Sequence, residues 1–339
     1  MKALINISII KSLTAKRIFN IIKATSSFFV SNIFKKHILW GKPYILTIEP
    51  TNRCNLNCPQ CVTGAGKLNR ATGRMSFATF QQIIDELSET LCYLVLFNQG
   101  EPFLHDELID FIRYANKKKI YVITSTNGHF LTAPNISEKL VKSGLDSIII
   151  SVDGADDKTY NKYRTGGNFD KVIKGVKKLV HYKKLSDKKN PKIFLQFLIM
   201  KHNEHQHEKI KFLAKELKVD KVLFKTVQVE NYEQAIKFLP ENKKWSRYTL
   251  NNNKLQLKYP TNSACSRLWT SSTILCDGTV VPCCFDKNGN YAFGFIKNRQ
   301  FFEQIWRSEK YVRFRLNILR QRESIDLCTN CTQGQKVFL

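Results

Sequence analysis

The chain has 339 residues, of which 43% are hydrophobic, so it is long enough to bury one barrel-sized core and a smaller module. Lys and Arg number 54 and Asp and Glu 28, a formal net charge of +26 that raises the question of anionic partners. Ten cysteines in short-spaced groups exclude a small disulfide-bonded secreted domain and are typical of metal ligation in a reducing compartment. We therefore expect a cytoplasmic, metal-binding protein.

Residues 1–43 form a basic, apolar and amphipathic segment that differs from the rest of the chain. They contain eight Lys or Arg residues, and the first acid of the chain is Glu49. Cations interrupt each apolar run, so none reaches the roughly 20 residues that span a bilayer. A signal peptide also fits poorly, because charges recur throughout. Two interpretations stay open: helices packed on the rest of the protein, or peripheral contact of residues 1–40 with an anionic membrane at its inner face.

Residues 44–230 alternate short β-branched apolar runs with amphipathic helical patterns. The predicted strands are 44–49, 92–97, 120–125, 147–151, 193–199 and 221–225. The predicted helices are 76–89, 106–117, 135–143, 169–184 and 204–217. This alternation predicts the α/β class, with a parallel sheet in an open doubly wound arrangement or a partial barrel. In either arrangement the chemistry belongs at the carboxyl ends of the strands.

Residues 231–260 are polar, with an Asn-rich turn at 251–253, and we interpret them as a bridge. Residues 261–339 form a second, small module. Strands are predicted at 273–276 and 279–283, joined at Asp277-Gly278, because Asp-Gly between two β-rich runs favours a hairpin turn. A helix at 301–319 and a closing Cys-Thr-Asn-Cys motif at 328–331 complete this module.

Three cysteines follow the first predicted strand in the spacing C-x3-C-x2-C: Cys54, Cys58 and Cys61. Three thiolates within eight loop residues can surround one compact metal centre, and soft sulfur ligands favour zinc or an iron-sulfur cluster. Zinc usually takes a fourth Cys or His, and this loop holds none. Three cysteines fit a four-iron cluster with one iron left open.

This arrangement resembles the radical S-adenosylmethionine (SAM) superfamily, in which the same spacing follows the first strand of a (β/α)6 partial barrel. The resemblance covers residues 44–226. It implies that a [4Fe-4S] cluster held by Cys54, Cys58 and Cys61 binds SAM. It further implies reductive cleavage of SAM to a 5′-deoxyadenosyl radical, which takes a hydrogen atom from a substrate.

Further motifs that resemble the family stand at the ends of successive predicted strands. The segment 99–102, Gln-Gly-Glu-Pro, is similar to the family's Gly-Gly-Glu-Pro, whose backbone and acid hold the methionine amino group, with Gln99 in place of the first glycine. The sequence also matches four later features of the family in the same order. These are a Thr-Asn-Gly turn, a polar residue at the end of the fourth strand, an arginine that neutralises the SAM carboxylate, and a residue near the adenine. The SAM-binding residues implied in this way are Gly100, Glu101, Pro102, Asn127, Ser151, Asp153, Arg164 and Met200.

A second group of cysteines lies in the C-terminal module at Cys265, Cys283, Cys328 and Cys331. Four thiolates can close either a complete four-iron cluster or a zinc site, and spacing alone does not choose. The order of these cysteines around the hairpin resembles the auxiliary-cluster extensions called SPASM and twitch domains, which implies a second [4Fe-4S] cluster. The later cysteines of a full SPASM extension are missing, so we expect one auxiliary cluster. Cys276 and Cys284 are left over, although Cys284 could replace Cys283.

The resemblance implies a SPASM- or twitch-type oxidoreductase, or a maturase of a peptide or small molecule. An external electron donor such as flavodoxin or ferredoxin is expected. An RNA-modifying enzyme is a weaker alternative suggested by the basic charge, but no RNA-binding module is recognisable, so we do not expect a nucleic-acid partner. A non-catalytic iron-sulfur or zinc scaffold is weaker still, because the SAM-binding motifs are retained. No residue is assigned as the general base.

Overall fold

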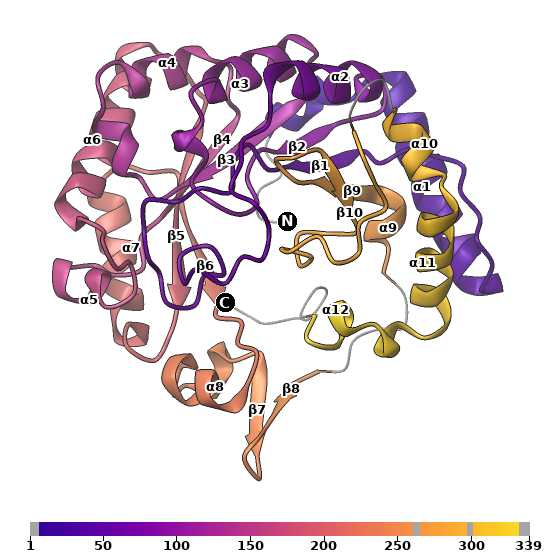
Figure 1. The fold of residues 1–339 in the computed structure, drawn as a ribbon. Coiled ribbons are helices and arrows are strands. Elements are labelled where there is room, and N and C mark those ends of the chain that lie inside the picture. The colour runs from indigo at the N-terminus through magenta and orange to yellow at the C-terminus, as the bar shows by residue number, and fades with distance from the viewer. Residues whose placement is uncertain (1–6, 260–264, 297–300, 332–339) are drawn as a thin grey trace.

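The computed structural model describes residues 7–259, 265–296 and 301–331. Its main feature is a curved sheet of nine strands with helices on the outer side (Figure 1). Six strands pair in parallel in chain order: β1 (Ile45–Ile48), β2 (Tyr93–Val95), β3 (Tyr121–Thr126), β4 (Ser147–Ser151), β5 (Lys192–Ile199) and β6 (Lys221–Thr226). The six predicted strands and the α/β class with a partial-barrel core are confirmed.

Five helices between these strands lie close to their predicted positions: α2 (Phe77–Leu87), α3 (Leu108–Lys117), α4 (Ile136–Lys142), α6 (Phe169–Leu185) and α7 (His207–Glu216). A short helix that the sequence did not predict, α5 (Asp157–Asn161), precedes α6. Short polar side chains begin several of them: Ser76 caps α2 and Asn168 caps α6, each accepting a backbone N–H from the first turn. All five residues of β4 are buried, which explains why this strand reads as an apolar run rather than an alternating pattern.

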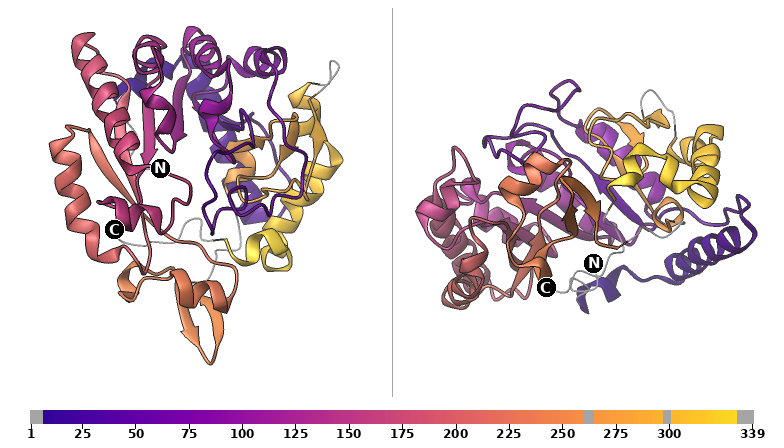
Figure 2. Two further views of the ribbon diagram at one scale, coloured as in Figure 1. Left: turned by 60° about the vertical axis from the view of Figure 1, so that its left-hand side comes forward. Right: turned by 90° about the horizontal axis from the view of Figure 1, so that it is seen from below.

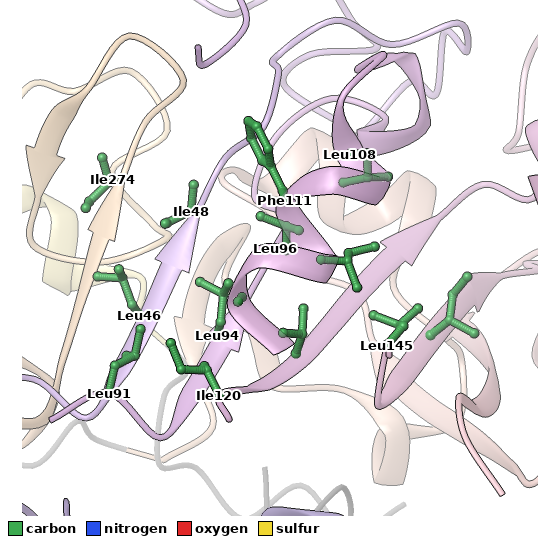
Figure 3. Packing of buried hydrophobic residues seen from close by; sticks show 14 of the residues in the cluster. Leu46, Ile48, Leu91, Leu94, Leu96, Leu108, Phe111, Ile120, Leu145 and Ile274 are labelled. Atoms are coloured by element: carbon green, nitrogen blue, oxygen red, sulfur yellow. The ribbon is translucent and has the colours of Figure 1, made fainter. Parts of the chain in front are cut away.

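The main hydrophobic core lies between the sheet and the outer helices. Figure 3 shows Leu46 and Ile48 of β1 close to Ile274, with Phe111 of α3 in the same region. Phe111 stacks on Phe80 of α2 at a ring-centroid distance of 4.1 Å. Because burying a large apolar side chain contributes about 1.5–3 kcal/mol, this layer fixes α2 and α3 against the first strands.

The bridge contains regular structure, α8 (Tyr232–Phe238) and a hairpin of β7 (Tyr248–Asn251) and β8 (Lys254–Leu257). The Asn-rich segment is the turn of this hairpin. Asn252 and Asn253 adopt φ of +47° and +59°, a region that asparagine tolerates better than most residues. The expected boundary between bridge and C-terminal module lies outside the described residues, as do residues 1–6, 297–300 and 332–339.

Strands of the C-terminal module extend the main sheet, which the sequence did not predict. β9 (Ser271–Ile274) pairs in parallel with β1, and β10 (Thr279–Val281) and β11 (Gly294–Phe295) follow in antiparallel order. The Asp277-Gly278 turn joins β9 to β10 as predicted, with Gly278 at φ +90°. β9 ends two residues earlier than expected because the Cys276 N–H donates to the Glu49 carboxylate at 3.3 Å instead of continuing the strand.

The helix predicted at 301–319 is divided into α10 (Phe302–Trp306) and α11 (Glu309–Arg320). Ser308 separates them, because its side chain accepts the Tyr311 N–H at 3.4 Å and begins a new helix. Two short helices complete the module, α9 (Arg267–Thr270) before β9 and α12 (Asp326–Thr329) near the end.

The amino-terminal segment contains a 3-10 helix (Ile7–Ser12) and one long helix, α1 (Ala15–Phe34). Arg17 of α1 donates to the backbone carbonyls of Ser88, Lys118 and Lys119, which precede β2 and β3. α1 therefore lies at the amino ends of these strands, opposite the ends that carry the site motifs. None of the helices in the described ranges is long and apolar enough to cross a membrane.

Candidate active site

The implied SAM-binding residues lie at the carboxyl ends of neighbouring parallel strands. Glu101 follows β2, Asn127 follows β3, Asp153 follows β4 and Met200 follows β5. The cysteine loop, residues 54–61, follows β1. Because parallel strands end at one edge of their sheet, the fold gathers these motifs from distant parts of the chain at a single site.

Gly100 and Glu101 pack directly on the backbone that leads into the cysteine loop. The Glu101 N–H donates to Arg53 O at 2.6 Å. Gly100 has φ of +76°, and a Cβ at this position would lie 2.5 Å from Arg53 O and 2.6 Å from Thr51 O. Both the backbone conformation and the lack of space require glycine here.

The Glu101 carboxylate is buried and accepts three hydrogen bonds from the protein. Thr126 Oγ1 donates to it at 2.8 Å, and the backbone N–H groups of Asn127 and Phe103 donate at 2.7 and 3.2 Å. Burial raises the pKa of Glu101 to about 7, although these hydrogen bonds act in the opposite direction. A nearby ammonium group would offset the burial and favour the charged carboxylate, which fits the role implied for Glu101 toward SAM.

Asn127 connects the third strand end to the cysteine loop. Its Nδ2 donates to Asn55 Oδ1 at 2.8 Å. Its Oδ1 lies 2.9 Å from His129 Nδ1, and His129 Nε2 accepts the Asn168 N–H at 2.8 Å. These contacts assign the proton of the neutral ring to Nδ1. Burial lowers the pKa of His129, which favours this neutral form.

Asp153 and Arg164 form a buried ion pair beside the same loop. Asp153 Oδ2 accepts from Arg164 Nε and Nη2, both at 2.6 Å, and Oδ1 accepts the Leu198 N–H at 2.8 Å. Burial lowers the pKa of Arg164, but the Asp153 charge and the other acidic groups around the guanidinium together raise it by more, so the guanidinium stays charged. Thr165 O accepts the Asn57 N–H at 2.9 Å, which ties the segment after Arg164 to the cysteine loop.

The remaining implied SAM contacts also lie at strand ends. The Met200 side chain is buried in a small cluster with Leu56 and Cys58 of the cysteine loop. Pro102 begins a 3-10 helix (Pro102–Leu104), and Ser151 is the last residue of β4 and is buried. The structure therefore brings Met200 to the cysteine loop and places Ser151 and Pro102 at the same edge of the sheet.

The three cysteines of the loop are free thiols, Cys58 buried and Cys54 and Cys61 half-buried. Burial raises the pKa of Cys58 to about 11, so the uncoordinated thiol holds its proton, and cluster binding must release it. Three unpaired sulfur donors beside Glu101 and Arg164 fit a cluster that also binds SAM. In the part of the chain that the structure describes, no group of three or more His, Cys, Asp or Glu side chains is arranged to hold a single metal ion.

The second cysteine group is assembled from three segments, the chain before α9, the loop after β10 and the end of the module around α12. Burial raises the pKa values of Cys265, Cys283 and Cys328, and each of these thiols interacts electrostatically with another of the group. Two cations that the sequence did not reveal, Arg267 and Arg322, lie beside these cysteines.

The left-over cysteines have protein partners. Cys284 Sγ lies 3.6 Å from Arg267 Nη1. Cys276 is buried next to an ion pair at the seam of β1 and β9, in which Glu49 accepts from Arg70 Nη2 at 2.7 Å. The Gln99 N–H also donates to Glu49 at 3.2 Å, so the residue that replaces the family's first glycine is held by this carboxylate. One sequence signal pointed to this pair, an acid at the end of the first predicted strand, 44–49.

A cavity of about 670 Å³ lies between the cysteine loop and the C-terminal module. Most of its lining is polar, and it comes from the cysteine loop, the segment after β6, the loop after β10 and the α12 region: Gln60, Val62, Gln228, Glu230, Phe285, Asp286, Lys287, Asn288, Asn290, Tyr291, Asp326, Leu327 and Asn330. Asn330, between Cys328 and Cys331, donates to Val229 O at 2.7 Å and accepts from Gln228 Nε2 at 2.9 Å. These bonds fix the second cysteine group against the last strand of the barrel.

The fold and the site define a class of protein, and two family models match it. The model of the radical SAM superfamily matches residues 48–216, and that of the iron-sulfur cluster-binding domain SPASM matches residues 265–332. The chain belongs to the radical SAM superfamily and carries a SPASM domain. It is an enzyme of this class, whose cofactors are SAM and [4Fe-4S] clusters, including an auxiliary cluster in the SPASM domain.

Particular relatives differ in how much of the chain they share. The AdoMet-dependent heme synthase of Methanosarcina barkeri is 30% identical over 40% of this chain and 39% of its own length. Mycofactocin maturase MftC of Mycolicibacterium smegmatis is 33% identical over 40% of this chain and 34% of its own length. The chain thus spans less than half the length of these two relatives. The tungsten-containing aldehyde ferredoxin oxidoreductase cofactor-modifying protein of Pyrococcus furiosus is 26% identical over 85% of this chain and 86% of its own length.

Solved structures share the fold at low sequence identity. SuiB of Streptococcus suis bound to the precursor peptide SuiA has a TM-score of 0.61 and 15% identity, and the match covers 86% of this chain and 70% of SuiB. The enzyme anSMEcpe with bound AdoMet has a TM-score of 0.58 and 17% identity, with 84% and 88% of the two chains covered. These likenesses confirm the fold that the sequence predicted.

Proposed function

We propose that this enzyme is an oxidoreductase or maturase that removes a hydrogen atom from a peptide or a small polar molecule bound in the cavity. The cavity carries the proposal, because Gln60 and Val62 of the cysteine loop and Asn330 of the second cysteine group line the same space. MftC is a maturase, and SuiB is seen with a precursor peptide, which favours a peptide as substrate. When bound, the cluster supplies the electron that cleaves SAM to the 5′-deoxyadenosyl radical, which abstracts the hydrogen atom.

The residues of the first site have separate roles in this proposal. Cys54, Cys58 and Cys61 hold the cluster. The Glu101 carboxylate orients the SAM ammonium, and the Arg164 guanidinium pairs with the SAM carboxylate. Asp153 Oδ2 accepts from both Nε and Nη2 of Arg164, so we assign Asp153 to positioning the Arg164 guanidinium.

The cavity is lined by Gln60, between Cys58 and Cys61, and by Asn330, between Cys328 and Cys331, so it borders both cysteine sites. We assign Cys265, Cys283, Cys328 and Cys331 as ligands of one auxiliary [4Fe-4S] cluster, which the match to the SPASM model supports in place of zinc. A substrate in the cavity would lie between the two cysteine sites, so an electron from its radical could leave toward the SPASM domain. The surrounding residues would exclude water from the radical.

We also propose that flavodoxin or ferredoxin reduces the enzyme in the cytoplasm. Ten free cysteines fit a compartment that keeps thiols reduced. The basic surface suits an acidic electron-transfer protein.

Anaerobic reconstitution tests these assignments. The wild-type protein should bind about eight iron atoms, and changing Cys54, Cys58 and Cys61 together to Ala should leave about four. With dithionite and SAM, the wild type should release 5′-deoxyadenosine and the triple variant should release none. Cys92→Ala, which changes a buried thiol at the opposite end of β2, is the matched control and should keep both clusters. Equal turnover by the triple variant and the wild type would refute the proposed function.

A further inference from the structure

The outward face of α1 is apolar, whereas the face that packs on the protein is mostly polar or small, with Phe28 against Trp269 as its one large apolar contact among the described rings. The buried residues of the helix are Arg17, Asn20, Ala24, Ser27 and Ser31. Large apolar side chains, which we call the α1 stripe, are between 45% and 73% exposed: Ile18, Phe19, Ile22, Phe29, Ile33 and Phe34. This arrangement is the reverse of an ordinary surface helix, whose apolar residues face the core.

Hydrogen bonds fix this orientation of α1. The Arg17 guanidinium donates to Ser88 O at 2.6 Å and to Lys118 O and Lys119 O at 2.7 Å. Asn20 exchanges two hydrogen bonds with the backbone of Lys42, at 2.9 and 3.0 Å. Rotating the helix to bury the stripe would leave a buried guanidinium without these partners, so the exposed stripe is a stable feature of the folded chain.

Exposed apolar surface is concentrated in this part of the molecule. More than half of the exposed large apolar side chains of the described residues lie between residues 10 and 40. Ile10, Leu13 and Trp40 add to the stripe at its two ends. Figure 2 shows α1 at the outer edge of the molecule in the view from below. A concentration of exposed apolar side chains on one helix marks an interaction surface.

The charges around the stripe indicate what covers it. Lys11, Lys35 and Lys36 are exposed near its ends, and Lys23 Nζ lies 4.4 Å from the ring centroid of Phe19. No acid precedes Glu49 in the sequence. Long lysine side chains can reach anionic headgroups while the apolar residues enter the acyl boundary. A second copy of this chain fits less well, because its net charge of +26 would meet the same charge.

We propose that α1 docks the enzyme peripherally on an anionic lipid bilayer, with the helix axis parallel to the surface and the α1 stripe at headgroup level. This proposal combines the two interpretations of the segment, with one face of α1 packed on the protein and the other on lipid. Arg17 holds α1 at the amino ends of β2 and β3, and the candidate active site lies at the opposite ends of the strands. Docking therefore leaves the cavity open to water, and the substrate enters from solution.

Flotation of the cluster-loaded protein with vesicles tests this surface. The stripe variant is Ile22→Glu with Ile33→Glu. The matched control is Leu185→Glu with Phe212→Glu. Leu185 is the last residue of α6 and is 71% exposed, and Phe212 lies near the middle of α7 and is 79% exposed. Wild type and control should float with phosphatidylglycerol vesicles and not with phosphatidylcholine vesicles. The bound fraction of the stripe variant should fall about tenfold.

Wild-type protein that stays unbound at low salt, or stripe and control variants that float equally, would overturn the proposal. So would a wild-type dimer that the stripe variant converts to a monomer in sedimentation, because the stripe would then face a second copy. Release of 5′-deoxyadenosine, measured without vesicles, should be equal in the stripe variant and the control. Loss of that release in wild type would count against the proposed function and not against the membrane contact.

Discussion

At Gly100 the chain passes so close to the cysteine loop that only a residue without Cβ fits. Gly100→Ala should destabilise the protein and reduce iron binding at the first cluster, because backbone atoms of residues 51–53 would have to move. Gly66→Ala is the matched control, because Gly66 has φ of +67° but open space around it. This change should lower the free energy of unfolding by only about 1–2 kcal/mol, which an alanine in the left-handed conformation costs. Denaturation and iron content measure both effects. Equal losses for the two variants would contradict this account.

Asp146 gives the protein a pH-dependent stability far from the clusters. It accepts the Val122 N–H at 2.9 Å, and burial raises the pKa of its carboxyl to about 6, from about 4 in the unfolded chain. Between these values the folded state binds more protons, so the contribution of Asp146 to the free energy of unfolding falls as pH rises. The free energy of unfolding of Asp146→Asn, taken relative to that of wild type, should therefore rise as the pH is raised from about 4.5 to about 7.

Urea denaturation at the two pH values measures that difference. Asp110→Asn, at an exposed carboxylate of α3, is the control and should keep a constant difference from wild type. A constant difference for Asp146→Asn as well would show that Asp146 does not couple folding to pH.

At the scale of elements, β9 makes the SPASM domain part of the barrel sheet. Ile45 to Ile48 of β1 pair in register with Ser271 to Ile274 of β9, and Ile274 is buried in the main core. Deleting residues 265–339 should expose the edge of β1 and this core, so the truncated chain should aggregate rather than fold as a free radical SAM domain. Solubility and far-UV circular dichroism measure the outcome.

A chain in which residues 250–255 of the separate β7–β8 hairpin are replaced by Gly-Gly is the control for this deletion. It leaves the nine-stranded sheet intact and should stay soluble. A soluble, folded product of the 265–339 deletion would show that the core does not need β9.

At the scale of the whole molecule, the charge of +26 should govern how the enzyme meets the electron donor proposed above. Reduction by flavodoxin, an acidic protein, should slow about tenfold between about 20 and about 200 mM salt, because charges are screened beyond about 10 Å at 0.1 M. Stopped-flow spectroscopy of the iron-sulfur absorbance measures this rate. Reduction by dithionite is the comparison and should change far less. A rate of reduction by flavodoxin that does not change with salt would show that electrostatic attraction does not contribute to the encounter.

The sequence by itself determined the local features of this protein. The six core strands were predictable because each reads as a short apolar run, and the cysteine triad was predictable because its ligands lie within eight residues. The order of motifs along the strand ends was enough to indicate a radical SAM enzyme. These features depend on neighbouring residues, so periodicity and spacing carry them.

Only the tertiary structure decided the features that join distant residues. The pairing of β9 with β1, the Glu49–Arg70 ion pair next to Cys276, and the cavity that borders the two cysteine sites each join segments about 20 to 270 residues apart. The direction in which α1 turns its apolar side also depends on Arg17, whose partners lie about 70 to 100 residues away. A hydrophobic pattern states which residues share a helix face. Whether that face meets the core or the surroundings is decided by the contacts that the opposite face makes.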